Sequence, residues 1–129
     1  MPPPEATRIF ETDADGLSDM IRMTLVNLGV PGHILGYPYL TTALSIVVNE
    51  PDAIHSMTKV LYPRVAKEHN TTSSRAERSI RHAIEVAYDR CDYEVLSACF
   101  GYTIDPNKGK PTNAEFIARV AESIRNQMA

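Results

Sequence analysis

Two arginines and a glutamate near position 77 have the chemistry to read DNA bases. The forked guanidinium groups of Arg75 and Arg78 can each bind O6 and N7 of guanine, a contact that discriminates against other bases by roughly 1–3 kcal/mol. The carboxylate of Glu77 can accept a hydrogen bond from the amine of cytosine. Glu77 can also pair with Arg81 one helical turn later, which contributes roughly 0.2–0.5 kcal/mol. The two roles of Glu77 are compatible, and both stay open.

The side chains around this group suit contacts with phosphate. Hydroxyls, cations and the N-terminus of a helix all bind phosphate oxygens, and this segment offers each of them. The phosphate-binding candidates are Thr71, Thr72, Ser73, Arg81, His82, Lys108 and Lys110. Residues 70–72 also match a glycosylation acceptor. The first residues lack the basic start and apolar core of a secretion signal, which argues against that use.

An amphipathic helix over residues 73–90 has to position these groups. Its apolar residues recur at helical spacing and form one stripe: Ala76, Ile80, Ala83, Ile84 and Ala87. At about 100° per residue, Arg78 points directly away from that stripe. A helix that reads the major groove with its first turns needs this layout. Either Thr72, or Ser74 with Glu77 as a capping box, could begin the helix.

The charge of the chain is unevenly distributed. The net charge is −3, which alone argues against a nucleic-acid partner. Residues 59–82, however, carry six cations and two carboxylates, a net charge of +4, and the remainder carries −7. Because salt confines charge effects to about 10 Å, a local basic face is sufficient for phosphate contact.

The other segments are also predicted to be helical. The expected helices cover residues 17–28, 38–48, 54–61, 64–69, 93–100 and 112–124. Gly29 with Pro31 should end the first, and a capping box at Thr112 and Glu115 should begin the last. Since no segment alternates like a strand, the predicted class is all-α. The helix at 64–69, the polar turn at 70–72 and the next helix fit a helix-turn-helix.

The chain lacks the residue patterns of catalysis, and we expect neither an enzyme nor a metal or cofactor site. Cys91 and Cys99 lie on or beside one short helix, without the clustered ligands of a metal centre. No apolar run approaches the roughly 20 residues of a membrane span, so we expect a cytoplasmic protein. Residues 1–13, rich in proline and acid, are expected to be a linker or disordered arm before a domain over 14–129.

Several motifs resemble one family. They are residues 58–63, Asn70-Thr71-Thr72, Ser74-Arg75, residues 77–87, Phe100-Gly101-Tyr102-Thr103 and Lys110-Pro111-Thr112-Asn113. Together they resemble the C-terminal effector domain of stage zero sporulation protein A, a response regulator of endospore-forming bacteria. The likeness covers about residues 17–127.

The resemblance implies a bundle of six helices that contains a helix-turn-helix. It implies a transcription regulator, activating or repressing, that binds tandem copies of a short DNA box as a monomer or weak dimer. It places Ser74 with Arg75, Glu77 and Arg78 as base-reading residues, and Arg81 and His82 near the backbone. A contact with the sigma subunit of RNA polymerase would map onto Asp92, Leu96, Ser97 and Phe100.

Two further readings stay open. The family usually has an N-terminal receiver domain, for which this sequence has no room, so we expect an excised effector domain or a short relative. The alternative function is a helical protein-interaction module that docks an acidic partner through its basic helix. Preference for one duplex sequence over another distinguishes DNA reading from that alternative.

Overall fold

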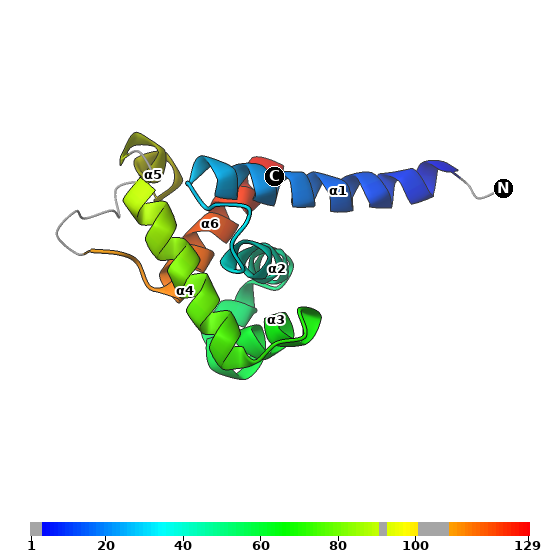
Figure 1. The fold of residues 1–129 in the computed structure, drawn as a ribbon. Helices are drawn as coiled ribbons and strands as arrows, with labels where there is room; N and C mark the ends of the chain where they lie inside the picture. The colour runs from blue at the N-terminus through cyan, green and yellow to red at the C-terminus, as the bar shows by residue number, and fades with distance from the viewer. Residues whose placement is uncertain (1–3, 91–92, 101–108) are drawn as a thin grey trace.

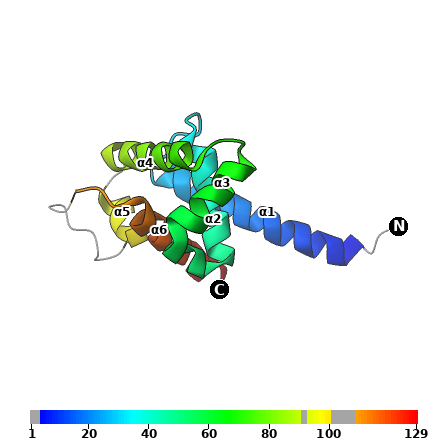
Figure 2. The same ribbon diagram turned by 90° about the horizontal axis from the view of Figure 1, so that it is seen from below.

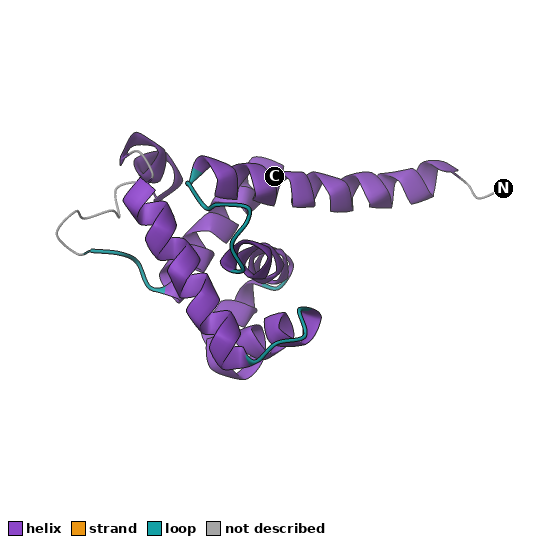
Figure 3. Ribbon diagram, in the orientation of Figure 1, coloured by secondary structure: helices purple, strands orange, loops and turns teal. Residues whose placement is uncertain are grey.

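The computed structural model describes residues 4–90, 93–100 and 109–129, and the regular structure in these residues is entirely helical (Figure 3). The elements in chain order are α1 (Pro4–Asn27), α2 (Gly36–Asn49), η1 (Pro51–Ser56), η2 (Met57–Leu61), α3 (Tyr62–Glu68), α4 (Ser73–Arg90), α5 (Tyr93–Phe100) and α6 (Asn113–Met128). The predicted all-α class is confirmed for this part of the chain.

The region between α2 and α3 differs from the prediction. Residues 51–61 form a 3-10 turn (η1) and a π turn (η2), where an α-helix over 54–61 was expected. The elements therefore do not match a simple bundle of six helices. Pro51 and Pro63 bracket this stretch and each removes a backbone N–H donor, which disfavours a continuous α-helical hydrogen-bond ladder.

The beginning of α1 is a second difference. The helix begins at Pro4, whereas residues 1–13 were expected to be a linker or disordered arm. Proline is tolerated in a first helical turn, and no further proline occurs before Asn27. Composition suggested a linker, but nothing in residues 5–13 breaks a helix. Figure 1 shows the first half of α1 projecting away from the other helices.

α1 ends where the sequence predicted, at a glycine. Gly29 has φ +88°, and its N–H donates to the Val26 carbonyl at 3.0 Å, while Val30 donates to Leu25 at 2.9 Å. These two bonds form a Schellman motif, which requires a left-handed residue at its centre. Leu25 and Val30 are both buried, so the motif also directs the chain back toward the core.

α2 is the centre of the hydrophobic core. It packs against α1, α4 and α6, and Figures 1 and 2 place α4 on the outside of the body. The predicted apolar stripe of α4 is confirmed, since all five of its members are at most 1% exposed. α2 begins at Gly36, two residues before the expected start at Pro38, which falls within its first turn.

Gly36 lies at a very close approach between α2 and α4. A Cβ atom at this position would overlap the Ser79 carbonyl oxygen and would lie 2.5 Å from the Cβ of Ala83. Only a residue without a side chain therefore allows the two helices to come this near. The contact fixes the start of α2 against the middle of α4.

The turn between α3 and α4 is set by Asn70. Its φ is +52°, and the flanking bonds run from Asn70 N–H to the Lys67 carbonyl at 3.4 Å and from Thr71 N–H to the Ala66 carbonyl at 2.9 Å. This is the same Schellman geometry as at the end of α1, with asparagine in the place of glycine. Asparagine is one of the few side chains that adopt this left-handed conformation readily.

Replacing Asn70 with valine should destabilise the fold by about 1–2 kcal/mol, because a β-branched residue is strained at positive φ. Asn70→Gly should leave stability within about 0.5 kcal/mol of wild type. Urea unfolding of the two variants measures this difference. Equal stability of the valine and glycine variants would contradict a left-handed turn at this position.

Candidate nucleic-acid interface

The outer face of α4 carries the residues that the sequence singled out. Ser74, Arg75, Arg78, Arg81 and His82 are all exposed, opposite the buried apolar stripe. Within the part of the chain that the structure describes, neither Arg75 nor Arg78 forms an ion pair. Both guanidinium groups thus remain available to a partner.

The start of α4 is now assigned to one of the two candidate caps. The Thr72 hydroxyl oxygen accepts a hydrogen bond from the Arg75 backbone N–H at 3.2 Å, whereas Ser74 lies inside the helix. An N-cap of this kind contributes about 1 kcal/mol. It holds the helix start, and with it the first exposed arginine, in a defined orientation.

Glu77 forms an ion pair on one flank of α4. Its carboxylate lies 3.6 Å from the guanidinium of Arg81, with side-chain exposures of 37% and 55% for Glu77 and Arg81. The i, i+4 pair considered from the sequence is therefore present. Because the pair is partly exposed, its contribution to stability is small, and its carboxylate can still meet another donor.

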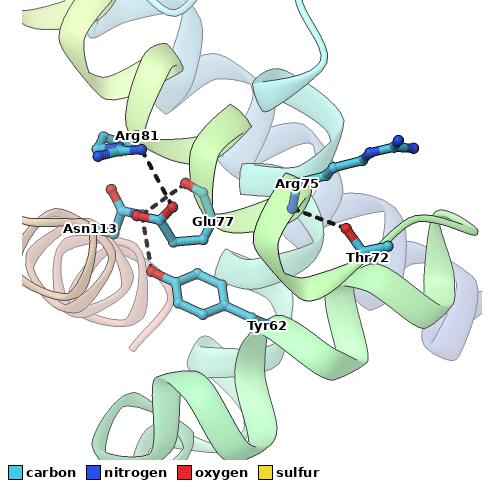
Figure 4. A network of polar contacts seen from close by, with 6 residues as sticks. All are labelled: Tyr62, Thr72, Arg75, Glu77, Arg81 and Asn113. Carbon is cyan, nitrogen blue, oxygen red and sulfur yellow. Dashed lines mark hydrogen bonds and ion pairs between the residues drawn. The ribbon is translucent and has the colours of Figure 1, made fainter.

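The same flank is joined to two other helices by a buried amide. Asn113, at the start of α6, donates from Nδ2 to the Tyr62 hydroxyl at 2.9 Å and to the Glu77 backbone carbonyl at 3.2 Å (Figure 4). Asn113 is 9% exposed. The confirmed capping box of Thr112 and Glu115 sets the start of α6 just before it. The amide thereby connects α3, α4 and α6 beside the cationic face.

Burial raises the pKa of the Tyr62 phenol above its usual value, and the hydrogen bond from Asn113 opposes this shift. The phenol is therefore neutral at physiological pH. It keeps its oxygen as an acceptor for the Asn113 amide, and no charge is introduced under α4. No sequence pattern predicted this network, since Tyr62 and Asn113 are 51 residues apart.

The opposite flank of α4 borders an open groove of about 390 Å³ between the starts of α2 and α4. Arg75 and Arg78 lie on one side, and Leu35 and Tyr39 on the other. In Figure 4, Arg75 and Arg81 extend from α4 in opposite directions. Cationic side chains therefore lie on both flanks of α4.

The remaining phosphate candidates are only partly brought together. Thr71 and Ser73 are half-buried at the turn and at the first position of α4. Lys110 is exposed, and its ammonium lies 3.2 Å from the Asp89 carboxylate near the end of α4. Lys108 lies outside the described residues. The structure therefore gathers Thr71, Thr72, Ser73 and His82 around α4, with Lys110 toward its far end.

The candidate sigma-contact residues are described in part. Ser97 is half-buried on α5, and α5 covers the predicted range of residues 93–100. Asp92 lies outside the described residues, as do the side chains of Leu96 and Phe100. The predicted surface therefore stays a prediction.

A comparison with protein families matches residues 21–124 to the family described as "Sporulation initiation factor Spo0A C terminal". The chain belongs to this family. The Spo0A C-terminal domain is the DNA-binding effector domain of a sporulation regulator and is not an enzyme family. The resemblance inferred from the motifs is thereby confirmed, as are its links to DNA binding, transcription regulation and sporulation.

Family membership makes double-stranded DNA the partner class of this Spo0A-type domain. In the described residues, no group of three or more His, Cys, Asp or Glu side chains could hold a metal ion. No described helix is long and apolar enough to cross a bilayer.

Proposed function

We propose that the chain is a sequence-specific transcription regulator in which α3, the turn at Asn70 and α4 form a helix-turn-helix, with α4 as the recognition helix. One observation carries the proposal. The face of α4 opposite its buried stripe presents exposed arginines in the first turns, where major-groove readers place their base contacts, and Arg75 and Arg78 form no ion pair with any residue that the structure describes.

Base reading is assigned to Ser74, Arg75, Glu77 and Arg78. Ser74, Arg75 and Arg78 are exposed, and each arginine can take a guanine edge in bidentate geometry. Glu77 combines two roles, because its ion pair with Arg81 leaves carboxylate capacity for a cytosine amine. The pair also orients Arg81 toward the flank where a DNA strand would run.

Phosphate contacts are assigned to Thr71, Thr72, Ser73, Arg81, His82, Lys108 and Lys110. The hydroxyls and the N-terminus of α4 suit one phosphate group. Lys110 can exchange its exposed ion pair with Asp89 for a phosphate, because such a pair contributes little in water.

The assembly proposed is a monomer or weak dimer that associates on tandem DNA boxes.

A contact with the sigma subunit of RNA polymerase is proposed for Asp92, Leu96, Ser97 and Phe100. The support for this second assignment is that three of these four residues lie on one helix, α5.

A salt-dependent binding titration tests the proposed function. It compares a duplex carrying the family's DNA box with a scrambled duplex of equal composition, from 50 to 300 mM salt. We expect a strong preference for the box, and affinity for both duplexes should fall by about 0.9 log units per tenfold rise in salt for each phosphate neutralised. Equal, weak binding to both duplexes would refute sequence-specific recognition. Binding to neither would favour the protein-interaction alternative.

A further inference from the structure

The groove beside Arg75 and Arg78 has an unusual combination of walls. Leu35 and Tyr39 form an apolar side, the two arginines form a cationic side, and Asn70 and Thr71 add polar groups at one end. Anionic ligands with an apolar body fit such a surface. Neither Leu35 nor Tyr39 has a functional role predicted from the sequence.

Leu35 is an exposed apolar residue that does not pack in the hydrophobic core. It is 66% exposed, although Val30 in the same loop is buried. The next residue, Gly36, is fixed against the Ser79 carbonyl and Ala83 of α4. The close approach therefore holds the exposed leucine beside the outer face of α4.

The end of the groove near the turn is held by His69. Its Nε2 atom lies 2.6 Å from the Thr42 hydroxyl, and its ring centroid lies 4.9 Å from that of Tyr39. These contacts join the end of α3 to α2. His69 therefore holds the apolar wall at Tyr39 next to the polar turn at Asn70 and Thr71. The groove is formed before any ligand binds.

The geometry of DNA identifies the occupant. A helix with its side chains is about 10–12 Å wide, close to the roughly 12 Å width of the major groove. With α4 in that groove, a sugar-phosphate backbone has to run along each flank. Arg81 lies on one flank and this groove lies on the other, since Ser79 and Arg75 face the start of α2.

We propose that the groove binds the sugar-phosphate backbone of one DNA strand, with Leu35 packed against deoxyribose and the Thr71 hydroxyl placed to meet the adjacent phosphate. The inference rests on the proposed function, because it places α4 in the major groove. It adds the loop between α1 and α2 to the DNA-binding surface. Since backbone contacts carry no sequence information directly, Leu35 contributes affinity for any duplex.

The test compares Leu35→Glu with Met23→Glu, on the family's box and on a scrambled duplex. Met23 is a matched control, because it is an apolar residue of similar exposure, 61%, on α1. A carboxylate at position 35 should meet the phosphates and weaken binding to both duplexes by about tenfold. The ratio of the two affinities should stay within about twofold, and Met23→Glu should bind like wild type.

A second variant separates apolar contact from charge. Leu35→Ala should lose about three- to fivefold in affinity, with an unchanged salt slope because no cation is removed. Phosphate ethylation interference should then show a weakened footprint on one strand only. Melting temperatures should match wild type for both Leu35 variants, since the side chain is exposed.

The outcomes distinguish the two proposals. Wild-type preference for the box together with unchanged affinity in Leu35→Glu would overturn the groove assignment and leave the proposed function intact. Absence of box preference in the wild type would overturn the proposed function itself. If Leu35→Glu lost affinity for an acidic peptide but not for DNA, the groove would be a protein-docking site.

Discussion

The Arg78→Ala variant should bind the family's DNA box roughly 5- to 150-fold more weakly than wild type, the effect of losing about 1–3 kcal/mol of bidentate base contact. Arg78 points directly away from the buried stripe of α4 and is exposed. Its removal should therefore leave the melting temperature unchanged. Binding to a scrambled duplex should fall only slightly, since one of several cations is lost.

Two matched variants separate base reading from charge. Arg78→Lys keeps the cation but lacks the planar fork, so it should retain non-specific affinity and still lose most of the preference for the box. Arg22→Ala removes an exposed arginine from α1, where it pairs with Asp19 at 2.7 Å, and should not change box affinity. Wild-type affinity of Arg78→Ala for the box would refute direct readout by this residue.

The Gly36→Ala variant should lose on the order of 10 °C in melting temperature, equivalent to about 3 kcal/mol. The added methyl group overlaps a backbone carbonyl of α4, which cannot rotate away as a side chain could. α2 and α4 then have to separate along the centre of the core. DNA binding should weaken as well at temperatures where the variant is folded, because α4 shifts relative to the α1–α2 loop.

Gly32→Ala is the control for this substitution. A Cβ atom at Gly32 meets nothing within 4 Å, and this glycine lies in the loop just before α2. Its stability should be equal to or slightly above that of wild type, because alanine reduces the entropy of the unfolded chain. Similar melting temperatures for the Gly36 and Gly32 variants would contradict the close approach of α2 and α4.

The sequence predicted those parts of the fold that depend on local pattern. The stripe of α4 was identified residue by residue, because helical periodicity and burial are linked directly. The capping box of α6 and the glycine end of α1 were found for the same reason, since caps involve residues close in sequence. The cationic outer face of α4 was predicted from the same periodicity, because it lies opposite the apolar stripe.

Features that depend on distant residues escaped the sequence analysis. The Tyr62–Asn113 bond and the contact of Gly36 with Ser79 join segments 51 and 43 positions apart, and no single-sequence pattern encodes such pairs. The π turn before α3 was missed because apolar spacing does not distinguish it from an α-helix. The early start of α1 was missed because composition was given too much weight. The groove at Leu35 was missed because a loop leucine carries no periodic signal.

The buried Asn113 amide has a consequence for the thermodynamics of binding. It fixes the Glu77 carbonyl to Tyr62 and to the start of α6, so the proposed base-reading face is rigid before DNA arrives. Little conformational entropy should then be lost by the protein on association, and the heat-capacity change should reflect buried surface without a contribution from folding. Because the proposed base-reading face is preorganised, we expect any change of shape on binding to occur in the DNA duplex.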